Sequence, residues 1–354
     1  MLAPGSTIGI LGVGQLGRML ASAAAKLGFR TAVYGPEAGR SPASYITPRA
    51  VDGAYEDDQA VEAFARSCDV VTYEFENVPA STAEAVLQAG RGLHPPAKAL
   101  AASQERIAEK TLFRSLNIDT VDFWDISNAD DLASALSVAG PSILKTRRFG
   151  YDGKGQARLA GNEDPASVLD DLGGGPWILE ALAPFEREVS QVAARTASGD
   201  VAFYDLFENQ HKDGILDRSI IPADASEALI SQAREASRKV MEALDYVGVL
   251  TVEFFVVGDR MLANEMAPRV HNSGHHTVEA CAVSQFEQHI RAVAGWPLRD
   301  PRTVTPSEMR NLIGPDVNDW ERLAADPVTS VTLYGKGEPR AGRKMGHIVR
   351  PLKT

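Results

Sequence analysis

Residues 145–155 combine basic side chains with glycines in a single predicted loop. They read KTRRFGYDGKG, with three glycines, and they follow a predicted strand. A glycine-rich backbone lets amide groups approach a ligand closely, while lysine and arginine neutralise phosphate charge. The pattern therefore favours a loop that closes on a polyphosphate. An exposed basic hairpin is the alternative, although a plain charged turn needs fewer glycines.

Two glutamates on neighbouring predicted strands form a candidate metal site. Glu253 and Glu265 lie on either side of the turn Gly258-Asp259. Carboxylate oxygens suit the Mg²⁺ that accompanies ATP phosphates, and ordinary surface acids are the alternative. With a two-residue turn Glu253 would face Asn264, so Glu265 would point to the other side of the sheet. A metal site here therefore requires a bulge or an odd-length turn.

Residues 265–276 read EMAPRVHNSGHH and combine an arginine with three histidines. The planar fork of Arg269 suits a carboxylate or a phosphate. His271, His275 and His276 could also bind zinc, but the local acids and Arg269 suit oxyanion handling better, and no cysteine joins them. Histidines that serve only the core or the surface remain an alternative.

Two further segments are glycine-punctuated. Residues 12–17 read GVGQLG after the first predicted strand, which permits a dinucleotide site, a site for another phosphate-bearing ligand, or a structural turn. A dinucleotide site would want an acid about 20 residues further on, and Glu37 fits poorly. Residues 334–347 read YGKGEPRAGRKMGH, which is either a solvated tail or a cationic arm that reaches the active site.

Composition excludes several classes of protein. The chain has 354 residues, of which 44% are hydrophobic, and a net charge of −11. It is therefore neither disordered nor a general partner for nucleic acid or an anionic membrane. Cys68 and Cys281 stand alone, which argues against disulfides and zinc motifs. With no apolar run long enough to span a bilayer, we expect a cytoplasmic protein.

Hydrophobic periodicity predicts an α/β region followed by an α+β region. Up to residue 100, short apolar strands alternate with helices, which indicates a parallel sheet with helices on both faces. From residue 142 the strands lengthen and alternate, which indicates antiparallel pairing. The expected strands include 7–11, 30–34 and 69–73, and the expected helices are 15–27, 57–67, 103–116, 226–244 and 278–294.

With these residues in hand, the sequence resembles the ATP-grasp enzymes and, more narrowly, the N5-carboxyaminoimidazole ribonucleotide synthetase family of purine biosynthesis. The resemblance covers nearly the whole chain. It is carried by GQLGRM (14–19), YEFEN (73–77), GYDGKGQ (150–156), NQHKDGI (209–215), residues 264–275 and GRKMGH (342–347). It implies a Rossmann-like domain over 1–100, an ATP-grasp domain over 101–295 and a small C-terminal domain over 296–354.

The resemblance also implies a reaction. ATP, bicarbonate and 5-aminoimidazole ribonucleotide would give the N5-carboxylated ribonucleotide, ADP and phosphate through carboxyphosphate, with Mg²⁺ as the metal and a homodimer as the assembly. No nucleic acid or membrane partner is expected. An NAD-dependent dehydrogenase, or an ATP-grasp ligase with another acceptor such as a formate-dependent glycinamide ribonucleotide transformylase, would be the rivals. A catalytically silent nucleotide sensor is a third.

The resemblance assigns roles to residues by their place in these motifs. Those expected around ATP are Arg106, Lys145, Gly150, Gly153, Gly155, Gln156, Glu180, Ala181, Leu182, Ala183, Glu188, His211, Asn264 and Glu265. Glu253 and Glu265 would hold Mg²⁺. Those expected at the reacting groups are Tyr151, Asp152, Lys154, Arg269, His271, Lys336 and Arg343. Gln15, Glu76 and Asn272 would contact the ribonucleotide.

Overall fold

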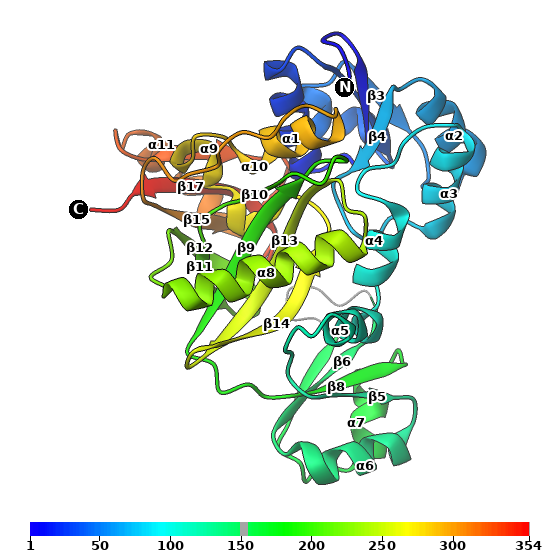
Figure 1. Cartoon of the computed structure of the whole chain (residues 1–354), viewed down its shortest axis with the longest axis vertical. Coiled ribbons are helices and arrows are strands. Elements are labelled where there is room, and N and C mark those ends of the chain that lie inside the picture. Colours follow the sequence, from blue (N-terminus) through cyan, green and yellow to red (C-terminus); the bar gives the residue numbers. More distant parts are fainter. Residues whose placement is uncertain (149–154, 354) are drawn as a thin grey trace.

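The N-terminal region is a four-stranded parallel sheet covered by helices (Figure 1). The computed structural model describes residues 1–148 and 155–353. The strand order is β3-β2-β1-β4, with the bounds β1 (Thr7–Leu11), β2 (Arg30–Gly35), β3 (Arg49–Asp52) and β4 (Val70–Tyr73). The helices are α1 (Gln15–Lys26), α2 (Asp58–Arg66), α3 (Ala80–Gln88) and the short η1 (Ala38–Arg40) and η2 (Pro42–Tyr45). The predicted parallel α/β architecture is confirmed.

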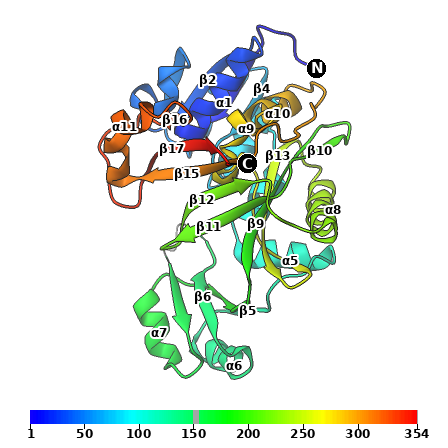
Figure 2. The same cartoon turned by 90° about the vertical axis from the view of Figure 1, so that its left-hand side faces the viewer.

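A small antiparallel sheet forms a lobe at the opposite end of the long axis (Figures 1 and 2). Its strand order is β5-β8-β6-β7. Its elements are β5 (Phe123–Ile126), α6 (Ala129–Ala139), β6 (Ser142–Thr146), β7 (Gln156–Leu159), α7 (Pro165–Leu172) and β8 (Trp177–Ala181). One apolar cluster joins the two helices to the sheet, so this lobe has its own core.

A larger antiparallel sheet forms the centre of the molecule. Among the described residues its strand order is β14-β13-β9-β11-β12-β15-β17-β16, and β10 pairs with β9. Its first strands are β9 (Arg187–Arg195), β10 (Val201–Phe203), β11 (Phe207–Lys212), β12 (Ile215–Ile221), β13 (Gly248–Val257) and β14 (Arg260–Ala267). The antiparallel pairing expected from the alternating strands is confirmed.

The two faces of this sheet are covered by different helices. Leu250 and Val252 of β13 pack with α8 (Glu227–Ala243). Val249, on the opposite face, packs in a cluster with α10 (Gln285–Val293) and α1. Because side chains alternate along a strand, β13 serves both cores. α10 thus joins the large sheet to the N-terminal region.

The C-terminal segment extends the large sheet. Its strands are β15 (Ser307–Ile313), β16 (Ser330–Leu333) and β17 (Lys344–Pro351), with η4 (Gly314–Asp319) and α11 (Trp320–Ala324) between them. β15 pairs with β12, so the strands continue across the expected domain boundary. The divisions at residues 100 and 295 remain predictions.

One expected helix begins later than predicted, and another is wrong as a single element. The helix expected over 103–116 is α5 (Arg106–Ser115), which begins three residues later because the Glu105 side chain accepts the Ile107 and Ala108 amides. The separate helix α4 (Ala97–Ser103) precedes it. The helix expected over 278–294 is α9 (Thr277–Ala280) and α10. Cys281 between them is extended and bridges Thr303.

No helix among the described residues is long and apolar enough to cross a membrane. Both cysteines are free, Cys68 buried and Cys281 partly buried.

Buried histidines should make the fold sensitive to acid. Burial lowers the pKa values of His276, His289 and His347 to about 3. An unfolded histidine binds a proton near pH 6.5, so the unfolded state holds up to three more protons below that pH. We expect each of these three histidines to contribute about 1.4 kcal/mol per pH unit to the fall in the free energy of unfolding between pH 5.5 and 4.5.

Urea unfolding at fixed pH steps measures this slope. His289→Gln is the test variant, because it should make the slope shallower by about 1.4 kcal/mol per pH unit whatever its effect on stability at pH 7. A slope that is the same in this variant as in the parent chain would contradict the prediction.

Candidate active site

The two glutamates predicted to hold a metal lie directly opposite each other. The hairpin closes with Val257 opposite Arg260, and the register shifts beyond Phe254 so that Glu253 faces Glu265. Asn264 is the extra residue on β14. This is the bulge that a metal site at this hairpin requires, and it brings both carboxylates to one face of the sheet.

Negative charge is crowded around this pair. Burial, and then Glu265, raise the pKa of Glu253 to about 7. Burial and Glu265 also raise the pKa of Glu109 to about 8, although Glu109 Oε1 accepts the Met266 amide at 2.6 Å. Arg106 Nη1 lies 3.4 Å from Glu265 Oε2. Two facing hard carboxylates fit a divalent cation that keeps waters and substrate phosphates as its other ligands.

A second charged cluster joins the small lobe to α5. Lys145 Nζ lies 2.6 Å from Glu180 Oε2, and Lys110 Nζ lies 3.8 Å from Glu180 Oε1. Burial would raise the pKa of Glu180, but Lys110 and then Lys145 outweigh it and lower the pKa to about 2. Glu180 therefore stays charged, and it holds Lys145 beside the loop that was predicted to bind phosphate. Lys110 is almost fully buried and was not predicted.

Gly155 and Gln156 lie at the edge of the predicted phosphate loop. Gly155 has a φ of +68°, and a Cβ there would lie 2.8 Å from Thr146 Oγ1, so this position needs glycine. Gln156 begins β7 opposite Lys145. Five of the predicted site residues lie outside the described part of the chain: Gly150, Tyr151, Asp152, Gly153 and Lys154.

The basic side chains before the loop have structural partners. Arg147 forms ion pairs with Glu105, at 2.6 Å, and Asp125, at 2.9 Å. Arg147 thereby ties β6 to the residue that caps α5. Arg148 Nη2 donates to Gln104 Oε1 at 3.3 Å.

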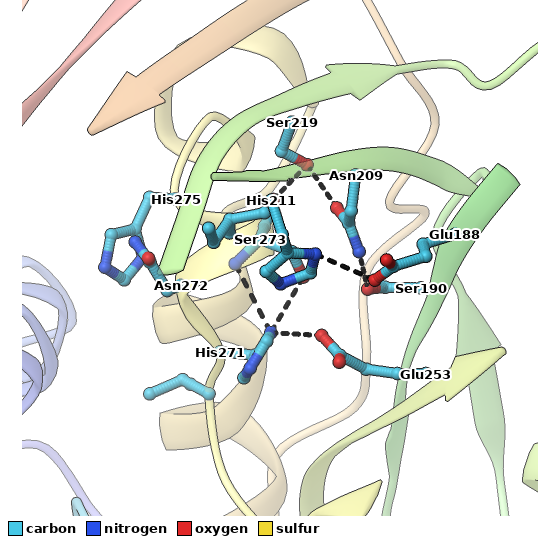
Figure 3. Close-up of polar contacts among 12 residues, drawn as sticks. Glu188, Ser190, Asn209, His211, Ser219, Glu253, His271, Asn272, Ser273 and His275 are labelled. Carbon is cyan, nitrogen blue, oxygen red and sulfur yellow. Dashed lines mark hydrogen bonds and ion pairs between the residues drawn. The ribbon is translucent and has the colours of Figure 1, made fainter. Parts of the chain in front are cut away.

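The residues predicted to flank adenine and ribose lie on both lobes. Ala181 ends β8, and the Leu182 amide donates to Pro141 O at 3.0 Å; Ala183 follows in the connection to β9. On the large sheet, His211 Nδ1 lies 2.8 Å from Glu188 Oε2 (Figure 3). Burial lowers the pKa of His211, but the hydrogen bond to Glu188 and the charges of Glu253, Glu188 and Glu265 together outweigh it, and the net shift is upward.

Arg269 is fixed by Glu76. Its Nε and Nη2 donate to the two carboxylate oxygens of Glu76, the latter at 2.9 Å, and its Nη1 donates to Val270 O at 3.1 Å. Burial would raise the pKa of Glu76, but Arg269 outweighs it and lowers the pKa to about 2. Each terminal nitrogen of Arg269 keeps one further N–H for an oxyanion. Glu76 thus orients the arginine.

His271 is held from two sides. Its backbone exchanges two hydrogen bonds with the Gln285 side chain, at 2.9 and 2.6 Å. Its ring Nδ1 lies 2.8 Å from Ser273 Oγ and 3.6 Å from Glu253 Oε1 (Figure 3). Burial and then Arg269 lower the pKa of His271 well below its usual value, so the ring is neutral. A Cβ on Gly274 would lie 2.9 Å from the Gln285 side chain, so the turn needs glycine there.

Asn272 has a partner within the protein. Its side-chain amide exchanges two hydrogen bonds with Asn311 of β15, at 3.0 and 2.7 Å. Asn272 therefore connects the turn after β14 to the C-terminal strands, a contact that was not predicted from the sequence.

The glycine loop at 12–17 encloses a carboxylate of the protein itself. Both Glu74 oxygens accept backbone N–H groups, one from Gly14 and one from Gly17. A Cβ on Gly12 would lie 2.2 Å from Glu74 Cγ, so Glu74 fills the space that the glycines leave. This arrangement excludes a pyrophosphate from the loop and argues against the dehydrogenase alternative. Gln15 begins α1 at the same end.

The basic C-terminal segment contacts the N-terminal region. Arg18 Nη1 donates to Leu333 O and Tyr334 O, at 3.0 and 3.1 Å. Lys336 Nζ lies 5.5 Å from the centre of the Tyr334 ring. Arg343 precedes β17, and its carbonyl accepts the Gly314 amide at 2.8 Å. Residues 334–343 are therefore held by hydrogen bonds at both ends. A solvated tail would not have these contacts, whereas a cationic arm directed at a site needs them.

His275 and His276 are core residues. Both are fully buried; His276 packs edge-on against Phe207, and His275 stacks near His347 of β17 with ring centroids 4.9 Å apart. Within the described ranges, no group of three or more histidines, cysteines or acids could hold a metal. The zinc alternative is therefore not supported there.

Four residues that hold other site residues or the glycine loop in place were not predicted from the sequence. They are Glu74, Lys110, Ser273 and Gln285. Glu74 lies inside the YEFEN motif, whose alternation with Glu76 could have indicated two inward acids. Nothing in the sequence pointed to Lys110 or Gln285, because their contacts join residues far apart in the chain.

The two antiparallel lobes and the charged clusters between them define an ATP-grasp protein. The family model of the ATP-grasp domain matches residues 111–286. The ribonucleotide synthetase preATP-grasp domain matches residues 5–104, and the phosphoribosylaminoimidazole carboxylase C-terminal domain matches residues 307–350.

Individual relatives show which family of ATP-grasp proteins the chain resembles. The chain is 50% identical to the N5-carboxyaminoimidazole ribonucleotide synthase of Brucella melitensis, over 99% of this chain and 97% of that protein. The crystal structure of the Thermus thermophilus synthetase superposes with a TM-score of 0.91 at 45% identity, covering 98% of this chain and 94% of that one. The Aspergillus clavatus synthase, in complex with ADP and 5-aminoimidazole ribonucleotide, superposes with a TM-score of 0.92 at 32% identity, covering 99% and 95%. The chain belongs to the N5-carboxyaminoimidazole ribonucleotide synthase family.

Proposed function

We propose that this chain carboxylates 5-aminoimidazole ribonucleotide at the expense of ATP, with bicarbonate as the carbon source, in purine biosynthesis. Membership of the synthase family supports the reaction. The structural observation that carries the proposal is the pair Glu253 and Glu265, brought face to face by a bulge beside Arg106 and Arg269. The match of the C-terminal family domain argues against the formate-dependent alternative.

The chemistry has two steps. A bicarbonate oxygen attacks the γ-phosphorus of ATP, the bond to the β-phosphate oxygen breaks, and ADP leaves. The product, carboxyphosphate, is a mixed anhydride. The amine of the ribonucleotide then attacks its carbon, the bond to the phosphate oxygen breaks, and the amine loses a proton. The protein must therefore neutralise several anions and exclude water from a labile intermediate.

The described residues divide this work between the lobes. Lys145 and Arg106, with Gly155 and Gln156 at the edge of the loop, hold the ATP phosphates. Residues 180–183, Glu188 and His211 hold the adenosine. Lys145 is already paired with Glu180, so it exchanges one anionic partner for another when nucleotide binds.

Bicarbonate and carboxyphosphate are assigned to the residues that follow β14. Arg269, oriented by Glu76, directs its remaining N–H groups at bicarbonate and carboxyphosphate, with His271 beside it. Lys336 and Arg343 bind the ribonucleotide phosphate, and Gln15 reaches the ribonucleotide from the N-terminal region. The predicted roles of Tyr151, Asp152 and Lys154 belong to this side too.

We propose Mg²⁺ as the metal, held by Glu253 and Glu265 with Asn264 alongside. When bound, it supplies charge neutralisation for the β- and γ-phosphates. The facing carboxylates and the raised pKa of Glu253 support this assignment.

We also propose a cytoplasmic homodimer. The free thiols of Cys68 and Cys281 support a reducing compartment. Exposed Tyr45 and Leu333, both near Arg18, support a surface for self-association. Sedimentation equilibrium measures the assembly.

ADP release tests the function. We expect release that depends on both bicarbonate and 5-aminoimidazole ribonucleotide. Release that ignores both, or that is replaced by oxidation of NADH, would end the proposal.

Lys336→Ala should separate the two halves of the site. We expect nearly unchanged ATP affinity and about 10²-fold slower carboxylation, because a cation on the ribonucleotide phosphate is lost while the ATP contacts remain. Calorimetry measures ATP binding, and product formation measures carboxylation. Lys98→Ala, which breaks the exposed ion pair with Asp245, is the control. An equal loss of ATP affinity would move Lys336 to the nucleotide site.

A further inference from the structure

The side chain of Gln104 binds the segment that follows β4. Gln104 directly follows α4, and its Nε2 donates to Glu76 O and to Val78 O, both at 2.7 Å. A carbonyl oxygen can only accept, so both amide protons are used and the orientation of the amide is determined. Residues 74–79 form no regular helix or strand. Gln104 therefore holds a segment that lacks the hydrogen bonds of a sheet or a helix.

Glu76 passes this restraint on to Arg269. Its two carboxylate oxygens accept from Nε and Nη2 of Arg269, the latter at 2.9 Å. The side chains are 31% and 16% exposed, so both are confined by their surroundings. Because the two N–H bonds of the fork are parallel, the guanidinium follows the carboxylate in position and in plane. Gln104, Glu76 and Arg269 are thus linked in series, from α4 to the turn after β14.

The other side of the Gln104 amide contacts the small lobe. Its Oε1 accepts from Arg148 Nη2 at 3.3 Å. The next two residues also contact this lobe: Glu105 pairs with Arg147 at 2.6 Å, and the Arg106 amide donates to Arg147 O at 3.1 Å. The link between α4 and α5 therefore contacts both the N-terminal region and the small lobe, between which these helices lie (Figure 1).

The place of the oxyanion beside Arg269 determines which nucleophile reaches carboxyphosphate. The ribonucleotide amine attacks the carbon and gives the carboxylated product, or water attacks the same carbon, loses a proton and gives bicarbonate. In both reactions the bond to the phosphate oxygen breaks and phosphate leaves, but only the first consumes ribonucleotide. A misplacement of about 1 Å slows an oriented attack by about 10²-fold. Water surrounds an exposed intermediate and needs no such alignment.

We infer that Gln104 is a positioning residue for carboxyl transfer. Its two donors hold the backbone at Glu76, and thereby hold the Arg269 fork where the amine, and not water, captures the intermediate. The inference rests on the proposed function for the identity of that intermediate. Gln104 carries no charge and transfers no proton, so its role is geometric.

Gln104→Met tests this role, because it removes both donors without adding a charge. We expect ATP affinity within about twofold of the parent chain, and a rise in the ADP released per ribonucleotide consumed from about one to about three or more. Calorimetry measures ATP binding. ADP and the loss of the free amine are measured in the same sample. A ratio that stays at the parent value in the folded variant would overturn the inference.

Gln232→Met is the matched control. Gln232 also bridges two backbone groups, Asp259 O at 2.9 Å and the Met261 amide at 3.1 Å, at the turn between β13 and β14. We expect an unchanged ratio of ADP to ribonucleotide in this variant. An equal rise in both variants would attribute the effect to any lost pair of hydrogen bonds, and the inference would fail.

Gln104→Glu separates the two sides of the amide. It keeps the length of the side chain and an oxygen for Arg148, but it places a carboxylate oxygen against two carbonyl oxygens. We expect the same rise in the ratio as in Gln104→Met, because the donors are lost in both. A parent ratio here would transfer the role to the Arg148 contact and refute the inference. This variant also replaces Gln104→Met as the test if that variant does not fold.

The double variant Gln104→Met/Arg269→Met asks whether Gln104 acts through Arg269. If it does, the double variant should carboxylate no more slowly than Arg269→Met alone, since the fork that Gln104 positions is already absent. A further loss as large as that of Gln104→Met by itself would show that Gln104 acts by another route, and would refute the inference.

A crystal structure of Gln104→Met tests the geometry without reference to activity. We expect the Glu76 carboxylate and the Arg269 fork to be displaced by about 0.5 Å or more, the tolerance of such sites. An unmoved fork would overturn the inference even if the parent chain carboxylates its substrate. A displaced fork, in a protein whose parent consumes no ribonucleotide, would support the positioning and count against the proposed function alone.

Discussion

Glu265→Gln should abolish ATP turnover that depends on bicarbonate and the ribonucleotide, by at least about 10²-fold. The substitution keeps the shape of the side chain but removes one of two facing carboxylates. Stabilisation of phosphate charge by a metal contributes several kcal/mol in such sites, which corresponds to this loss. ADP release at saturating Mg²⁺ measures it. Wild-type ADP production in the variant would contradict the metal assignment.

The same variant should change little in stability. The Glu265 side chain is 43% exposed, and its charge raises the pKa values of both buried neighbours, Glu109 and Glu253. Removing it relieves this repulsion but also ends the ion pair with Arg106, so we expect a free energy of unfolding within about 1 kcal/mol of that of the parent chain. Glu62→Gln, at an exposed ion pair on α2, is the control and should change neither activity nor stability appreciably. A larger loss of stability in Glu265→Gln would indicate that Glu265 has a structural role instead.

Three strands of the N-terminal sheet, β1, β2 and β4, could be predicted because they are short, mostly buried apolar runs. The edge strand β3 was not predicted, because it begins with Arg49, ends with Asp52 and is only partly buried. The strand over 7–11 has the predicted bounds, and Asp57 caps α2 as expected. The break between α9 and α10 could not be predicted in this way. It depends on the bridge between Cys281 and Thr303, a contact that local periodicity does not contain.

In the candidate site, too, local sequence predicted some features, while others depend on contacts between distant residues. Strand alternation indicated that a metal site at this hairpin required a bulge or an odd-length turn, but which of them the hairpin adopts depends on its packing against β9 and α5. The glycines at 12–17 predicted a loop whose backbone N–H groups could bind an anionic ligand. In the structure these N–H groups bind the side chain of Glu74, which follows the neighbouring strand β4. A motif therefore predicts a local geometry, and the fold decides which group occupies it.

The ion pair between Glu76 and Arg269 joins catalysis to stability, since it connects the N-terminal region to the end of β14. Truncating one partner leaves the other charge poorly solvated. We expect Glu76→Gln to lower the free energy of unfolding by about 2–4 kcal/mol and Arg269→Met to do the same. Both should slow carboxylation more than tenfold, because the guanidinium is displaced in one and absent in the other.

The double variant Glu76→Gln/Arg269→Met distinguishes a coupled pair from two independent contributions. Replacing both charges removes the unpaired charge that each single variant leaves, so we expect the double variant to be about 2 kcal/mol more stable than the sum of the single effects allows. Carboxylation should not recover, because no fork remains to bind the oxyanion. Urea unfolding provides the free energies. Asp300→Asn, at the exposed pair with Arg302, should change them by less than about 0.5 kcal/mol. Additive effects in the double variant would mean that Glu76 and Arg269 act separately, and the orientation of Arg269 would then need another cause.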